Sequence, residues 1–145
     1  MVQQLNAVVG QRGRLTAKEV VLSLPLSGLT LVNDGDVVVR TTDGKSVTAI
    51  AGATPTRFGV VVRHGVGKTG KTTAGKEAYK AADMVPVMFE GAIWVKPTAP
   101  ITDITAAVYV KTANGTTAAP LGSLSSSATD GTVLPGACLL YTSDA

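Results

Sequence analysis

Short runs of β-branched and other apolar residues, separated by turn-forming residues, recur along the whole chain. Such runs are typical of strands, and strands that follow one another without intervening helices favour antiparallel pairing, because a parallel crossover needs a dozen or more residues. The pattern therefore predicts an all-β fold, a compact antiparallel β-barrel or a jelly-roll-like sandwich. The expected strands are Val20–Leu24, Leu29–Val32, Asp36–Thr41, Ser46–Ile50, Phe58–Arg63, Met84–Phe89, Ala92–Val95, Ala107–Lys111 and Cys138–Thr142.

Glycine-containing turns join several of these runs. Asp43-Gly44 is a favoured hairpin turn and predicts a hairpin across residues 41–46. Glu90-Gly91 predicts a hairpin between Val85–Phe89 and Ala92–Val95, and Asn114-Gly115 predicts a turn after the strand that contains Tyr109. The best helical candidate is Ala74–Met84, which is not cleanly periodic, so we expect one short helix at most.

Two polar stretches predict loops or arms. Residues 1–18 contain Gln, Asn, Arg and Gly around a short apolar patch, and residues 112–132 are rich in Thr, Ala, Ser and Gly. Both are either flexible surface chain or segments that become ordered against a neighbouring subunit. We expect a flexible N-terminal arm at 1–18 and a single β domain at 19–145, with a long basic hairpin loop inside it.

Composition excludes several classes of protein. Hydrophobic residues make up 45% of the chain and charged residues 16%, which is too apolar for a disordered protein. A single cysteine, Cys138, cannot form an internal disulfide, so a disulfide-stapled secreted module is excluded. We expect no signal peptide and no membrane span, and folding in a cytoplasm.

The positive charge is concentrated in one segment. Between residues 57 and 80 lie six basic residues and one acidic residue, Glu77, whereas the rest of the chain has seven basic and nine acidic residues. Such a segment is a solvated surface loop or a contact for an acidic protein surface. We do not expect nucleic acid as the partner, because Tyr79 is the only aromatic residue between His64 and Lys80 that could stack on a base.

One motif resembles a catalytic site. Residues 65–72, Gly-Val-Gly-Lys-Thr-Gly-Lys-Thr, match the P-loop pattern, in which a lysine and a hydroxyl, here Lys71 and Thr72, hold phosphate and magnesium. A working P-loop opens a helix, but Gly75 falls in the first turn of the required helix. We therefore expect a solvated cationic hairpin tip and keep nucleotide binding as an alternative.

Other catalytic or metal chemistry finds no support. His64 and Cys138 are the only histidine and cysteine, so no zinc site with His/Cys spacing can form. His64 is expected to be a solvated loop residue, and Cys138 a small buried hydrophobe. We expect no enzyme activity, no catalytic residue, no metal and no cofactor.

The order of β landmarks is similar to that of a known family. Gly35–Val39, Gly59–Val62, Asp83–Val87 and Gly91–Val95 follow one another, and Val108-Tyr109-Val110 comes before a closing strand at 137–142. From about Leu31 to Ala145 this succession resembles the small capsid decoration, or structural cement, proteins of tailed bacteriophages. The long insertion at Gly65–Lys80 and the N-terminal stretch depart from the family pattern.

The resemblance implies a structural protein of the virion. It would lie on the outer surface of the phage head as a homo-oligomer, a dimer or trimer, and would clamp neighbouring major capsid proteins, with no catalytic residues. A virion host-surface or carbohydrate-binding β-sandwich is a further alternative. The residues that we expect to contact the capsid are Gln11, Arg12 and Arg14 of the arm and Lys68, Lys71 and Lys76 of the basic loop.

Overall fold

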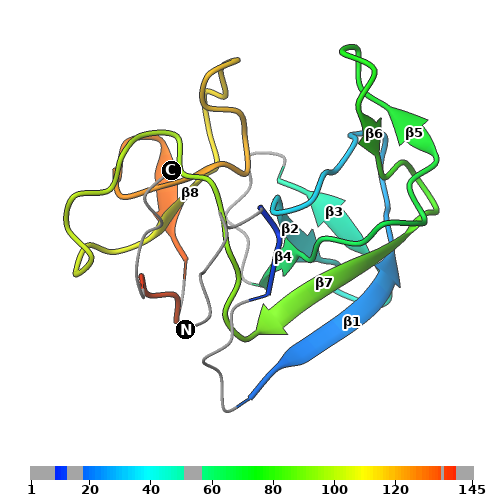
Figure 1. Cartoon of the computed structure of the whole chain (residues 1–145), viewed down its shortest axis with the longest axis horizontal. Helices are drawn as coiled ribbons and strands as arrows, with labels where there is room; N and C mark the ends of the chain where they lie inside the picture. The colour runs from blue at the N-terminus through cyan, green and yellow to red at the C-terminus, as the bar shows by residue number, and fades with distance from the viewer. Residues whose placement is uncertain (1–8, 13–17, 51–56, 135, 140–145) are drawn as a thin grey trace, which may run out of the picture.

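The structure, a computed structural model, describes residues 9–12, 18–50, 57–134 and 136–139. This part of the chain is built from strands and contains no helix (Figure 1). The strands are β1 (Val20–Pro25), β2 (Val37–Arg40), β3 (Val47–Ala49), β4 (Phe58–Val61), β5 (Gly70–Lys71), β6 (Glu77–Ala78), β7 (Met84–Glu90), β8 (Tyr109–Lys111), β9 (Leu124–Ser125) and β10 (Gly131–Val133).

Five strands form the main sheet, in the order β1-β7-β4-β2-β3, and each pair of neighbours is antiparallel. The sheet curls until its two edges meet at one end. There Leu26, which directly follows β1, bridges Val47 of β3, and the amide of Ser27 donates a hydrogen bond of 2.8 Å to the Val47 carbonyl. The result is a half-barrel closed at one end, which satisfies backbone groups that an open sheet edge would leave unpaired.

Alternating side chains of the main sheet enter two different cores. Val38 of β2 points into the half-barrel, where it belongs to the same buried cluster as Val61, Val87 and Tyr79. Its neighbour Val37 points outward. Successive side chains of a strand lie on opposite faces. The uninterrupted apolar run Val37-Val38-Val39 is therefore explained by a strand that is covered on both faces.

The outer face is covered by the second sheet, with the order β10-β8-β9. Val110 of β8 and Leu124 of β9 pack with Val37 and Ile50 in a second core cluster, to which Phe58 and Val60 of the main sheet also contribute. The main sheet therefore has a core on each of its two faces. β8 and its neighbours lie on the left of the molecule in Figure 1.

The inner core is so tightly packed that one strand position must lack a side chain. A Cβ atom at Gly59 of β4 would collide with the Val87 side chain, and it would lie 3.0 Å from the Phe89 ring. The ring of Phe89 in turn lies below the guanidinium of Arg40, at 5.6 Å from its centroid. Gly59 therefore allows the aromatic ring to cross over the neighbouring strand.

Most strands predicted from the sequence are confirmed, as is the hairpin across residues 41–46, where β2 turns into β3. Two are wrong. In Leu29–Val32 only Val32 pairs, through a bridge to Tyr79, and in Ala92–Val95 only Ile93 pairs, with Arg12. The Glu90-Gly91 hairpin is therefore also wrong, because β7 is already occupied on both sides by β1 and β4.

The helix considered at Ala74–Met84 is absent, and its residues form a turn, β6 and the start of β7. Helix propensity here is overridden by strand pairing, a common outcome for short segments. The stretch 112–132, expected to be loop, contains β9 and part of β10 and pairs within its own chain. Of the expected Cys138–Thr142 strand, Cys138 and Leu139 are not in a strand, and the rest lies outside the described residues.

Candidate functional site

The basic segment forms a hairpin that projects from the half-barrel. β5 and β6 pair through Gly70↔Ala78 and Lys71↔Glu77. In the turn between them the Thr72 amide donates to the Lys76 carbonyl at 2.8 Å, and Gly75 takes the left-handed conformation with φ +82°. Figure 1 shows this hairpin at the upper right, on the side of the molecule away from β8.

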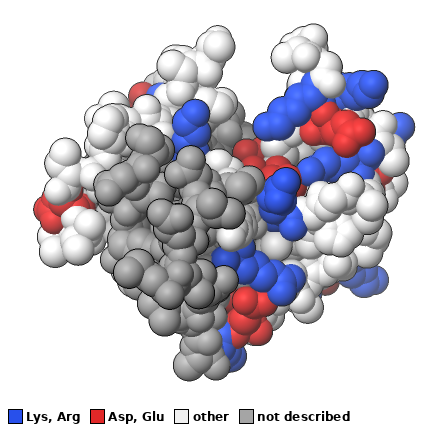
Figure 2. All heavy atoms as spheres, in the orientation of Figure 1, with Lys and Arg blue, Asp and Glu red and all other residues white. Residues whose placement is uncertain are grey.

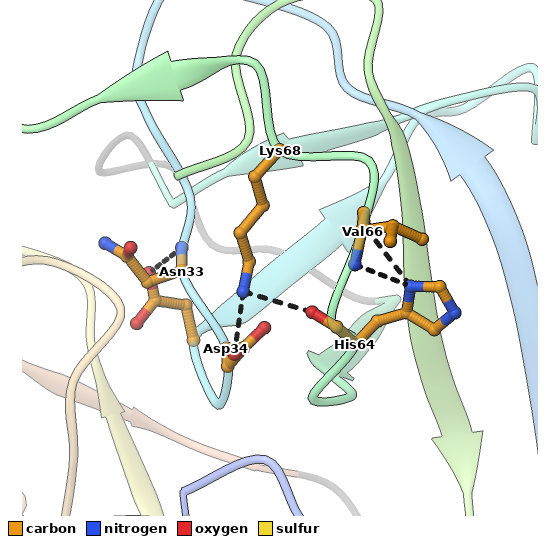
Figure 3. Close-up of polar contacts among 6 residues, drawn as sticks. Asn33, Asp34, His64, Val66 and Lys68 are labelled. Carbon is orange, nitrogen blue, oxygen red and sulfur yellow. Dashed lines mark hydrogen bonds and ion pairs between the residues drawn. The ribbon is translucent and has the colours of Figure 1, made fainter. Parts of the chain in front are cut away.

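An ion pair holds the base of the hairpin against the half-barrel (Figure 3). The ammonium of Lys68 lies 2.8 Å from a carboxylate oxygen of Asp34, donates a hydrogen bond of 3.3 Å to the His64 carbonyl, and lies 5.4 Å from the centroid of the Tyr79 ring. The Lys68 and Asp34 side chains are 14% and 21% exposed, so this pair is largely shielded from water. Lys68 therefore fixes the hairpin to the domain.

The carboxylate of Asp83 holds the hairpin from its other side. It accepts hydrogen bonds from the Thr69 amide at 3.0 Å, the Thr69 hydroxyl at 2.8 Å and the Lys80 amide at 2.9 Å. These bonds, above all the one from the Lys80 amide, lower the pKa of Asp83 below its ordinary value. Both ends of the projecting segment are thus tied to the half-barrel by polar contacts.

The P-loop motif does not form a phosphate cradle. The Thr69 amide, which a P-loop would direct at phosphate, donates to the Asp83 carboxylate, and Gly70 is a strand residue paired with Ala78. Thr72 begins a hairpin turn in place of a helix, so no helix dipole faces this loop. The geometry argues against nucleotide binding by Lys71 and Thr72.

Cationic side chains remain available on the outside of the hairpin. Lys71, Lys76 and Lys80 are exposed, with Glu77 as the acidic residue among them. Figure 2 shows Lys and Arg side chains gathered over this projecting lobe. We call Lys71, Lys76 and Lys80 the hairpin lysines. Together they make the hairpin predominantly positive, although Glu77 lies opposite Lys71, and such a surface can contact an acidic partner.

The described part of the N-terminal stretch lies beside the start of the basic segment. The Gly10 carbonyl accepts a hydrogen bond of 2.8 Å from the Arg63 amide, and the Gly10 amide donates to the Trp94 carbonyl at 2.7 Å. Arg12 forms an ion pair of 2.9 Å with Glu19. Residues 9–12 are therefore fixed to the domain, with exposed side chains at Gln11 and Arg12.

The structure thus brings together Gln11, Arg12 and the beginning of the basic loop, which the sequence had placed on separate segments. Of the other expected contact residues, Lys71 and Lys76 lie on the exposed hairpin, whereas Lys68 is engaged with Asp34. Arg14 lies outside the described residues. Sequence reasoning did not identify Asp34 and Asp83, because their partners are 34 and 14 residues away.

The remaining candidates for chemistry are isolated. His64 is exposed, and its Nδ1 atom lies 3.1 Å from the Val66 carbonyl oxygen. Cys138 is exposed, so the expectation of a buried cysteine is wrong. Over the described ranges no group of three or more His, Cys, Asp or Glu side chains could hold a metal ion, and no helix is long and apolar enough to cross a membrane.

The fold and the site together define a small β protein whose notable surface is a projecting cationic hairpin. Comparison with protein families identifies the family within this class. Residues 3–145 match the family described as structural cement protein (E217 gp24/Pam3 gp6), a family of phage cement proteins. The chain belongs to this family, and its role is that of a structural cement or decoration protein of a phage capsid.

The match spans nearly the whole chain, including the basic insertion and most of the N-terminal stretch. Comparison with curated proteins found no match. The family implies association with capsid proteins and a location on the virion capsid, and it indicates a non-enzymatic role.

Proposed function

We propose that this protein binds the outer surface of a phage head and stabilises the contacts between neighbouring major capsid proteins. Membership of the structural cement family carries this proposal. The exposed hairpin lysines on the projecting β5–β6 hairpin support it, because they offer positive charge to an acidic partner surface. The other two functions considered, a P-loop nucleotide-binding protein and a host-surface or carbohydrate-binding module, are favoured by no observation.

The hairpin lysines are the surface that we assign to the capsid contact. Lys71 and Lys76 lie at the two sides of the hairpin turn, and neither forms an ion pair within the described residues. Lys68 contributes indirectly, by fixing the base of the hairpin. Because many copies act on one lattice, modest individual contacts are sufficient to hold the shell together.

We also propose that the protein acts as a homo-oligomer, a dimer or trimer. Several large apolar side chains are exposed in the single chain, among them Leu29, Val66 and Met84, and contact between copies would remove them from water. Light scattering coupled to size-exclusion chromatography measures this directly. A mass of one chain at micromolar concentration would contradict the oligomer and leave the capsid contact untouched.

Charge reversal at the hairpin tests the capsid contact. The double variant Lys71→Glu/Lys76→Glu is mixed with heads assembled without this protein, and bound protein is quantified after sedimentation. We expect binding to weaken about tenfold or more, since two attractive charges become repulsive. A matched control, Lys45→Glu/Lys96→Glu, makes the same change of net charge at exposed lysines away from the β5–β6 hairpin. Equal weakening by both variants would contradict a role for the hairpin.

A further inference from the structure

A recess lies where the N-terminal segment meets the basic segment. It has a volume of about 330 Å³ and lies between residues 10–12 on one side and residues 62–64 on the other. Val62 and Pro86 give it apolar surface, while Arg12, Arg63 and His64 give it polar and cationic surface. We call this recess the arginine groove.

The two arginines of the groove differ in their partners. The Arg12 guanidinium is held by Glu19 at 2.9 Å. Arg63 is exposed, and its side chain has no ion pair and no hydrogen bond to any residue that the structure describes. A guanidinium presents a planar fork of donors that matches a carboxylate, so Arg63 offers the groove an unused bidentate site.

Backbone hydrogen bonds hold both sides of the groove in place. The backbone of Arg63 donates to the Gly10 carbonyl at 2.8 Å, and the Val62 amide donates to the Pro86 carbonyl at 2.9 Å. Gly10 has φ +81°, and a Cβ atom there would lie 2.9 Å from the Arg63 amide nitrogen and 3.1 Å from that of Gly35. The close approach of the two segments therefore depends on this glycine, and the groove exists before any partner arrives.

We propose that the arginine groove receives an Asp or Glu side chain from an extended segment of the major capsid protein. Arg63 binds the carboxylate through two parallel hydrogen bonds, and Val62 and Pro86 contact apolar atoms of the same segment. Because Arg12 is already paired with Glu19, Arg63 supplies the attractive charge. This inference rests on the proposed capsid contact and adds a second anchor, separate from the hairpin lysines. The groove recognises an acidic segment, and the hairpin a broader acidic surface.

Charge reversal at Arg63, matched to reversal at Arg57, tests the groove. Both arginines are exposed and flank β4, one after its end and one before its start, but Arg57 does not line the groove. Affinity for heads assembled without this protein is measured at low and at high salt. We expect Arg63→Glu to weaken binding about tenfold and Arg57→Glu less than about twofold, with the difference shrinking near 1 M salt, where charges are screened within roughly 3 Å.

Arg63→Lys separates fork geometry from charge. Lysine keeps the positive charge but cannot bind a carboxylate through a planar pair of donors, so we expect an intermediate loss, about threefold. If the Arg63→Lys variant bound heads as tightly as the wild-type protein, the bidentate contact would be overturned. Thermal unfolding of each variant accompanies the binding assay, so that a loss of fold is distinguished from a loss of contact.

A photo-crosslinking amino acid at position 64, on the rim of the groove, identifies the occupant. After irradiation on heads, mass spectrometry should find the crosslink on an Asp- or Glu-containing segment of the major capsid protein. A crosslink to a second copy of this chain, or to a capsid segment without acidic residues, would overturn the proposal. If the wild-type protein fails to bind heads, the proposed function itself fails; if it binds and Arg63→Glu matches Arg57→Glu, the groove inference alone fails.

Discussion

The ammonium of Lys68 lies 2.8 Å from the carboxylate of Asp34, a residue 34 positions earlier in the chain. This pair connects the base of the β5–β6 hairpin to the turn that precedes β2. Because both side chains are largely shielded from water, removing one partner costs more than breaking an exposed ion pair, since it leaves a shielded charge uncompensated. The orientation of the projecting hairpin therefore depends on a residue in another segment.

Lys68→Ala should destabilise the protein, because it leaves the Asp34 carboxylate shielded from water without its partner. We expect a loss of about 2 kcal/mol in the free energy of unfolding, measured by urea denaturation. Lys71→Ala, the same substitution at an exposed lysine three residues on, should cost less than about 0.5 kcal/mol. Equal stability of the two variants would show that the ion pair does not anchor the hairpin.

The contribution of Asp83 should depend on pH. Its folded-state pKa is lowered below the ordinary value of 3.8, chiefly by the hydrogen bond from the Lys80 amide and also by Thr69. A lowered pKa means that the carboxylate stabilises the fold above pH 3.8 and that this contribution is lost as the pH falls through the folded-state pKa. Asp83→Ala should therefore lower the melting temperature at pH 7, and wild type and variant should converge as the pH falls through the folded-state pKa.

Thermal unfolding followed by circular dichroism between pH 2.5 and 7 measures this convergence. Glu77→Ala serves as the control, because Glu77 lies on the same hairpin, is exposed and caps no backbone amide in the described structure. A gap between wild type and Asp83→Ala that stayed constant across the whole range would contradict the role assigned to the ionised carboxylate.

Gly59→Ala should be among the most damaging single-methyl additions in this chain. The added Cβ collides with Val87 and crowds the Phe89 ring in the inner core, where neither neighbour can move freely. Overpacking of this kind costs about 1–3 kcal/mol, measurable by urea denaturation. Gly65→Ala is the matched control, because a Cβ there meets no atom within 4 Å, and it should leave stability nearly unchanged. Comparable losses at both positions would argue against tight packing around β4.

The strands of the main sheet could be predicted from sequence because their signals are local. Val37-Val38-Val39 is apolar without a break, and the Asp43-Gly44 turn fixes the hairpin that follows. The sequence of Ala92–Val95 is equally typical of a strand. It cannot pair with β7, however, because both edges of β7 are taken by β1 and β4. Local pattern gives strand propensity, whereas pairing depends on which edges are left free.

The site was less predictable than the fold. The lysines of the basic segment are evident in the sequence, but nothing local distinguishes the engaged Lys68 from the exposed Lys71. That distinction arises from Asp34, which folding brings to Lys68 across the half-barrel. The arginine groove likewise depends on the hydrogen bond between Gly10 and Arg63, more than 50 residues apart in the chain.

Electron cryomicroscopy of phage heads, assembled without this protein and then incubated with it, tests the central claim most directly. We expect ordered density for the protein on the outer surface of the shell, at the junctions between major capsid proteins, with the β5–β6 hairpin directed at the capsid. Heads that sediment without the protein and show a bare outer surface would contradict it.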